Sequence, residues 1–472
     1  MLLQSKHIKR LIAIVCAATM IFSLSSTAFA LDSSMYIELA NSGNLDANTE
    51  RISKEGPGYD TIRLDQKEYL AQWEKASKSI SMDEKDIIQD TCELFISTIY
   101  AERRSKEYDC MEFTVPIRYN EQQDATLMYI KSQNQYQREI SELCGFDIVE
   151  DNISFEDFNA QISGDICTAH VQLHYSYELK GEFEDTFFLN CEYYLTLNRV
   201  GEKWRVASVR TSLPNEQTEN FSYGAFDAHA AAITVFKEHD LGEADARETE
   251  KGIIAEPNGE AYSYKTTPYN ATTAVNYAKR YFNQTNQMFD ASDANCQNFA
   301  SQCVWAGLRV GCGGAGTSTT DFPAVSTAWA GSNAANIWCR NQYTTRYGSS
   351  YWLNWGWDNV NGFLKIILLS DHTQSGPQGY YWRGISKAAV GDVIYWDTSN
   401  SHSINNGDYE HAMFVTQATG TSGARGISNL CIAANTAPTT SAYMPLAQYC
   451  SYPASWFATA HITGGYYWVS NY

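Results

Sequence analysis

The acidic residues of this 472-residue chain are concentrated in its first half, and this asymmetry limits how the chain can fold. Residues 31–260 hold 45 of the 54 acidic residues and 21 of the 34 basic ones, a balance of −24, whereas residues 261–472 hold 9 and 10, a balance of +1. The chain also exceeds the ~250–300 residues at which one hydrophobic core stops growing. We therefore expect at least two domains. Because neither half has a basic stripe, nucleic acid is not an expected partner.

The first 30 residues have the features of a secretory signal peptide. Three basic residues precede an apolar run over residues 11–24, and the small residues around Phe29 provide a cleavage site after Ala30. No later apolar run approaches the ~20 residues that span a bilayer. We expect a protein that is secreted, extracellular or associated with the cell wall, without a membrane span.

Eleven cysteines follow the predicted cleavage site, and most could pair as disulfides in an oxidising compartment. Because the number is odd, at least one cysteine lies outside any intramolecular pair. Their connectivity cannot be deduced from the sequence, so an inter-domain bridge and additional free thiols both remain open.

Residues 81–212 are predicted to form a small α+β domain. A capping box at Ser81 to Glu84 and a periodic apolar face indicate a first helix, and a second is expected over residues 124–144, ending at Gly145. Residues 171–180 and 189–198 alternate apolar and polar side chains, and a third strand starts near Trp204. This order resembles the cone-shaped fold of the nuclear-transport-factor and polyketide-cyclase-like superfamily, for which we expect a structural or docking role.

The flanking segments have weaker patterns. Residues 31–80 are polar and predicted to be irregular, whereas residues 213–264 combine charge runs with Gly and Pro and are typical of a linker. A short helix near residues 225–238 fits within this linker.

The stretch 293–308 places Cys296 at the start of a predicted amphipathic helix. Apolar or small residues recur at helical spacing, at Cys296, Phe299, Ala300, Cys303, Val304 and Gly307. Asp293 or Asn295 could cap its first turn, where free N–H groups and the helix dipole favour a thiolate.

This stretch resembles the putative amidase domain family of secreted bacterial proteins, within the papain-like cysteine hydrolases. The matching motif is Cys296, Asn298, Phe299, Ser301, Gln302 and Gly307, and one departure is Asn295, where the family often has an acidic residue. The resemblance covers about residues 265–472. It implies an α+β papain-like fold, in which the helix bearing the cysteine packs on an antiparallel sheet.

Cysteine-catalysed amide hydrolysis needs an imidazole base and a polar group that orients it. His411 starts a predicted apolar strand after the strand that begins near Gly391, as in the family, so we prefer it to His402, which lies in a polar loop. Asn435 ends the next strand and is the predicted orienting residue, although a simple Asn-Thr turn also explains it. The expected oxyanion donor is the backbone N–H of Cys296, with the side chain of Asn295 as a further candidate.

We therefore expect a secreted cysteine amidase or peptidase that cleaves an amide bond in a peptide or in cell-wall peptidoglycan. Transfer to an amine instead of water is an open variant. The alternative is a catalytically silent wall-binding or adhesion module, which would be indicated by Cys296 in a disulfide. No CxxC spacing is present, and His170 and His174, four residues apart along a strand, are too far from each other to share a metal, so neither a metal nor a cofactor is expected. The sequence does not indicate an oligomeric state.

Overall fold

The computed structural model describes residues 84–116, 124–180, 183, 185–213, 225–240, 250–251, 262–286, 295–309, 340–345, 348–353, 355–368, 376–397, 411–437, 440–450 and 456–470. All of the described residues belong to one compact unit, Ser53–Tyr472. The predicted signal peptide and the whole of the predicted irregular segment, residues 31–80, lie outside the described residues.

Two helices open the described chain, as the sequence predicted. Helix α4, Glu84–Glu102, buries the whole predicted apolar face, which consists of Ile88, Cys92, Phe95, Ile96 and Ile99. Helix α5, Ala125–Cys144, begins where the Asp124 carboxylate accepts hydrogen bonds from the N–H groups of Thr126 and Leu127. It ends at Gly145, whose φ of 75° is the left-handed conformation that a glycine adopts without strain.

An antiparallel meander follows. Its strands are β1, Asp147–Ser163; β2, Ile166–Lys180; β3, Thr186–Val200; and β4, Lys203–Thr211. Side chains on β2 alternate strictly between buried and partly or fully exposed positions, which is the pattern that predicted it. Strand β1 was not predicted, because its many acidic residues and half-exposed positions hide the period of two.

The C-terminal part combines antiparallel strands with short helices. Its elements are β6, Tyr262–Pro268; α7, Ala271–Tyr281; α8, Cys296–Arg309; β7, Arg340–Thr345; β8, Gly348–Leu353; α9, Trp355–Asp358; α10, Val360–Leu368; β9, Gly376–Arg383; β10, Val393–Asp397; β11, His411–Ala418; η6, Ile427–Asn429; β12, Leu430–Ala437; β13, Thr440–Pro445; α11, Leu446–Tyr449; and β14, Trp456–Ser470. The predicted helix that begins at Cys296 and the predicted strands that begin near Gly391 and at His411 are confirmed, as is the next strand, which carries Asn435.

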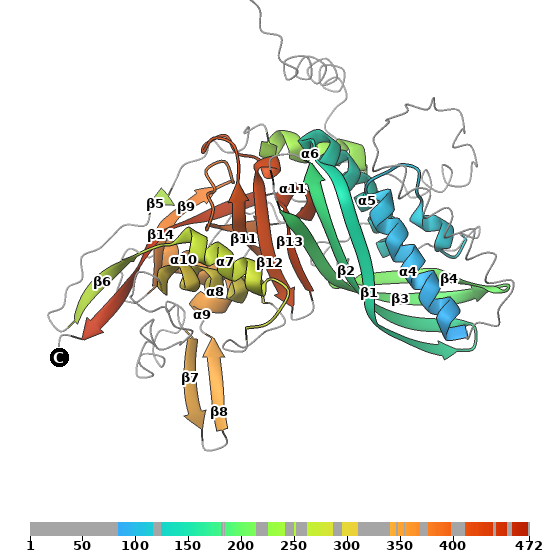
Figure 1. Cartoon of the computed structure of the whole chain (residues 1–472), viewed down its shortest axis with the longest axis horizontal. Helices are drawn as coiled ribbons and strands as arrows, with labels where there is room; N and C mark the ends of the chain where they lie inside the picture. Colours follow the sequence, from blue (N-terminus) through green and yellow to red (C-terminus); the bar gives the residue numbers. More distant parts are fainter. Residues whose placement is uncertain are drawn as a thin grey trace, which may run out of the picture. The chain divides into compact units, whose positions relative to one another are not determined.

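One sheet runs through both parts of the described chain. Its strand order is β1-β2-β3-β13-β12-β11-β10-β14-β9-β5, where β5 is Glu250–Lys251, with β4 also on β3 and β6 on β14. The central junction is antiparallel pairing of Phe188, Leu189 and Asn190 on β3 with β13. Helices α7 and α8 pack together, and α8 contacts β11 and β12 (Figure 1). The fold is therefore α+β, as predicted.

The predicted linker contains helix α6, Ala228–Asp240, and this helix is packed against its neighbours. Ala231, Ala232 and Val235 are buried, and the ring of His239 meets Phe457 of β14 edge-on at 4.8 Å. At its other end the N–H of Phe226 donates to the hydroxyl of Ser132 on α5. This helix therefore links α5 to β14.

The expectation that most cysteines pair is wrong for the described residues. Nine cysteines lie there, and none of them forms a disulfide: Cys92, Cys110, Cys144, Cys167, Cys191, Cys296, Cys303, Cys431 and Cys450. All except Cys144 are buried, where each fills core volume as a small apolar side chain. Cys312 and Cys339 lie outside the described residues.

None of the helices in the described part of the chain is long and apolar enough to cross a membrane.

Candidate active site

Helix α8, which starts at Cys296, is buried on every side. The sequence predicted one apolar face, but each residue from Asn295 to Leu308 is buried, including the polar Gln297, Asn298 and Ser301. A buried polar side chain destabilises the fold unless it is hydrogen-bonded. The partners of these side chains therefore determine how the helix is held.

The polar residues of the family motif provide these bonds. The Asn298 Oδ1 atom accepts from Trp357 Nε1 at 2.8 Å and from Gln302 Nε2 at 3.0 Å. The hydroxyl of Ser301 donates to the Trp357 carbonyl at 2.6 Å, and the hydroxyl of Tyr277 donates to Gln302 at 2.7 Å. The motif thus fixes the orientation of α8 between α7 and α9.

Gly307 allows α8 to approach the start of α7. A Cβ atom at this position would lie 2.3 Å from Cε2 of Tyr269 and 2.9 Å from the Asn270 carbonyl oxygen. The Gly307 carbonyl also accepts a hydrogen bond from the N–H of Asn270 at 3.0 Å. Only glycine fits this contact without displacing Tyr269.

The Cys296 thiol lies at the N-terminal end of α8, against the start of β11. The backbone N–H groups of Ala412, Gln297 and Cys296 itself lie near the sulfur and act to lower the pKa of the thiol. Burial nevertheless raises the pKa of the Cys296 thiol, because these N–H groups offset the loss of solvent only in part. The structure therefore favours a neutral thiol, where the sequence predicted that the helix N-terminus would favour a thiolate.

His411 is the first residue of β11 and directly precedes Ala412, whose N–H contacts the Cys296 sulfur. Only 3% of His411 is exposed, and burial lowers the pKa of its imidazole to about 4. The Nε2 atom lies 2.8 Å from the hydroxyl of Tyr449, and the two rings stack at 5.7 Å. Trp396 packs edge-on against the imidazole, with the ring centroids 6.4 Å apart.

Asn435, the predicted orienting residue, is hydrogen-bonded to other groups. Its Oδ1 accepts from Asn295 Nδ2 at 3.0 Å, and its Nδ2 donates to the Phe282 carbonyl at 3.1 Å. The Asn295 N–H donates to the carbonyl of Thr436 at 2.9 Å. The end of β12 therefore positions Asn295, the residue before Cys296. The side chain that is hydrogen-bonded to His411 is Tyr449 and not Asn435.

His402, the other histidine considered as the base, lies outside the described residues. A further histidine, His461, is paired with the buried Asp392 at 2.9 Å. Burial acts to lower the pKa of His461, but the hydrogen bond and the charge of Asp392 outweigh burial and raise this pKa. This pair ties β14 to the turn before β10.

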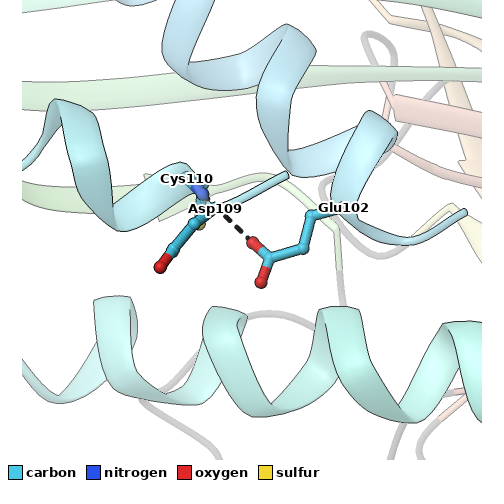
Figure 2. Close-up of side chains that lie close together, drawn as sticks. All are labelled: Glu102, Asp109 and Cys110. Carbon is cyan, nitrogen blue, oxygen red and sulfur yellow. Dashed lines mark hydrogen bonds between the residues drawn. The ribbon is translucent and has the colours of Figure 1, made fainter. Parts of the chain in front are cut away.

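A second group of titratable side chains lies between α4, α5 and the short helix η1, Cys110–Phe113. Figure 2 shows Glu102, Asp109 and Cys110 close together, with the Cys110 N–H donating to Glu102 at 3.2 Å. Lys131 forms ion pairs with both carboxylates. Burial acts to lower the pKa of Lys131, but the two carboxylates outweigh burial and raise this pKa, so Lys131 stays protonated. Because Lys131 bridges both carboxylates, this cluster is an ion-pair network that fastens η1 to two helices.

Comparison with known proteins bears on the part that carries Cys296 and His411. Residues 268–459 match the family model described as a putative amidase domain. The matched segment contains α8, β11, β12 and α11, and so includes Cys296, His411, Asn435 and Tyr449. The match supports an enzyme that hydrolyses amide bonds.

No curated protein matches the chain. A solved structure, described as the crystal structure of the Kfla4162 protein from Kribbella flavida, shares 14% sequence identity. The aligned region covers 27% of this chain and 91% of the Kribbella protein. Its TM-score of 0.20 is too low to inform the fold.

Sequence reasoning missed Tyr449 and Trp357, the two aromatic residues that hold the candidate site. Tyr449 ends the four-residue helix α11, which is too short for a periodic signal. Trp357 lies among many tryptophans, so nothing local distinguishes it. The only usable signal was the set of polar residues on α8, whose burial requires partners.

Proposed function

We propose that this chain is a secreted cysteine amidohydrolase that cleaves an amide bond in a peptide or in peptidoglycan. Cys296 is the nucleophile and His411 is the base. The observation that carries this proposal is the placement of the Cys296 sulfur on the backbone N–H that follows His411, within a domain that matches an amidase family. Secretion rests on the predicted signal peptide.

The pKa directions support a pair that is neutral at rest. Burial raises the pKa of Cys296 and lowers that of His411, so thiol and imidazole are both uncharged near pH 7. In the first step the thiol proton passes to Nδ1 of His411 as the sulfur bonds to the substrate carbonyl carbon. The imidazolium then protonates the leaving nitrogen, the C–N bond breaks and a thioester remains.

Water completes the cycle. His411 accepts a proton from the water as its oxygen attacks the thioester carbonyl, the C–S bond breaks, and the proton returns to the sulfur. The products are a carboxylic acid, the amine and the regenerated thiol. The same thioester would pass to an amine in a transpeptidase.

Tyr449 is the proposed positioning residue for the base. With Nε2–H donating to the Tyr449 oxygen, Nδ1 of His411 is left as the basic atom. Burial raises the pKa of Tyr449, so the phenol stays neutral and does not carry a competing charge. Asn435, through Asn295, positions the nucleophile instead of the base.

The oxyanion is expected to bind the backbone N–H groups around the sulfur. Those of Cys296 and Gln297 belong to the first turn of α8, where the helix dipole also favours negative charge. The Asn295 side chain, the other predicted donor, uses one Nδ2 hydrogen to bond Oδ1 of Asn435 at 3.0 Å.

The test is release of amines from purified peptidoglycan and from a peptide library by the full-length mature protein. Cys296→Ala should abolish release, whereas Cys303→Ala, a free thiol two turns along the same helix, should retain it. Circular dichroism of both variants controls for folding. Release by Cys296→Ala at the wild-type rate would refute the assignment.

A further inference from the structure

Helix α11 carries the tyrosine that bonds to the base, but this helix is a single turn. Its last residue, Tyr449, is buried, and its hydroxyl lies 2.8 Å from Nε2 of His411. The first turn of a helix fixes several backbone angles for one hydrogen bond, so a single turn is not stable alone. The position of Tyr449 therefore depends on what α11 contacts.

Two side chains from the N-terminal part of the chain bond to the end of α11. The Nε2 atom of Gln137 on α5 donates to the carbonyl of Cys450, the residue that follows the helix, at 2.5 Å. The hydroxyl of Tyr177 on β2 donates to Oε1 of Gln448 at 2.5 Å. Gln448 and Cys450 are the two neighbours of Tyr449 in the sequence. Residues outside the segment that matches the amidase family therefore hold both neighbours of Tyr449.

Burial makes these two bonds important for the position of the helix. Gln137, Tyr177 and Cys450 are all buried, so solvent does not replace a lost partner there. The carbonyl of Cys450 lies at the C-terminal end of α11, where the last carbonyls of a helix have no partner within it. Loss of either donor would therefore favour a shift of α11.

The strand before α11 is held by the same part of the chain. Strand β13 pairs with β3, and Nδ2 of Asn190 on β3 donates to the hydroxyl of Ser441 at 3.2 Å. The hydroxyl of Tyr443 on β13 donates to the carboxylate of Asp185, which precedes β3, at 2.8 Å. The N-terminal part therefore contacts both β13 and α11, the two elements that lead to Tyr449.

We propose that Gln137 and Tyr177 are positioning residues for the base, and that they act through α11 and Tyr449. This inference rests on the proposed function, in which the Tyr449 hydroxyl sets the tautomer of His411. With α11 fixed, the Tyr449 oxygen stays within hydrogen-bond distance of Nε2, and Nδ1 is left to accept the thiol proton. The N-terminal part thus contributes to catalysis, in addition to the structural or docking role expected from the sequence.

The first test reads the tautomer of His411 by nitrogen NMR of the full-length mature protein with isotope-labelled histidine. His411→Gln assigns the signals. Wild type should show one tautomer, with the proton on Nε2. Gln137→Met, which keeps the length of the side chain but removes the donor, should show a mixture of tautomers, and so should Tyr177→Phe. Wild-type signals in both variants would overturn the proposal.

Two control variants make the same changes where the hydrogen bond goes to another helix. Gln135→Met lies on α5 as well, where the Gln135 amide bonds to Glu139 of the same helix. Tyr193→Phe removes a buried hydroxyl from the same meander, where it lies 3.2 Å from the hydroxyl of Tyr100 on α4. Both controls should keep the single tautomer and the wild-type kcat. A mixture in the controls as well would show that any change in this part disturbs His411, and would overturn the specific role.

Catalysis is measured separately, in a double-mutant cycle with Tyr449→Phe. Gln137→Met should lower kcat about tenfold with little change in KM, as expected for the loss of one buried hydrogen bond. In the Tyr449→Phe background the same change should lower kcat no further, because both substitutions act on the same bond to His411. A second tenfold loss in the double variant would show that Gln137 acts independently of Tyr449, and would overturn the proposal.

Failure of this proposal is distinguishable from failure of the proposed function. A tautomer that changes in Gln137→Met, in a protein that releases no amine from any substrate, would contradict the proposed function and leave the positioning of His411 standing. An active enzyme with the same tautomer and the same kcat in wild type, Gln137→Met and Tyr177→Phe would contradict the positioning and leave the amidohydrolase standing.

Discussion

Burial of His411 predicts that this residue makes the protein less stable in acid. The unfolded imidazole has an ordinary pKa of 6.5, and burial lowers it to about 4 in the folded protein. Below pH 6.5 the unfolded chain therefore binds a proton that the folded chain excludes. The free energy of unfolding falls as the pH drops from 6.5 to 4, by about 3 kcal/mol at 1.36 kcal/mol per pH unit.

Urea unfolding of wild type and His411→Gln at pH 7.5 and pH 4 measures this contribution. The glutamine amide can still bond to Tyr449 but does not titrate, and all other groups are common to both proteins. Wild type should lose about 3 kcal/mol more than the variant between the two pH values. Equal losses would refute the argument, because they would mean that His411 is protonated as easily in the folded protein as in the unfolded one.

Further substitutions test the supporting contacts. Tyr449→Phe should lower kcat by about tenfold or more with little change in KM, because the His411 imidazole loses its orienting bond. The acid limb of the pH–rate profile should also shift. Steady-state kinetics measures both effects, and an unchanged kcat would exclude a positioning role. Gly307→Ala should cost about 1–3 kcal/mol of stability, because its Cβ would meet the ring of Tyr269; a melting temperature equal to wild type would contradict the contact. Asn435→Ala should lower the free energy of unfolding by about 1–3 kcal/mol and reduce activity, because the buried amide of Asn295 loses this partner. Chemical unfolding measures the loss of stability. Retention of full stability would show that the bond to Asn295 is dispensable.

Local signals in the sequence predicted the helices and many strands. Helix α5 is the clearest case, because Asp124 and Gly145 mark its two ends by their capping chemistry. The elements that carry Cys296 and His411 were also predicted, since each begins with a recognisable periodic or apolar run. These features depend only on near neighbours in the chain.

Long-range contacts could not be predicted in the same way. The pairing of β3 with β13 joins residues about 250 positions apart, and no local pattern specifies such a partner. The same limit applies to Tyr449, which reaches His411 from a helix of four residues. The prediction that Cys296 is a thiolate was wrong for a different reason. The sequence indicated the helix N-terminus, which lowers the pKa of the thiol, but not the burial, which raises it by more.

The most direct test of the central claim is alkylation of the unreduced mature protein with iodoacetamide near neutral pH, followed by peptide mapping. We predict that Cys296 is labelled before Cys303, and that His411→Gln slows labelling of Cys296 alone. Labelling of Cys296 at the same rate in wild type and His411→Gln would contradict the claim that His411 takes the proton from this thiol.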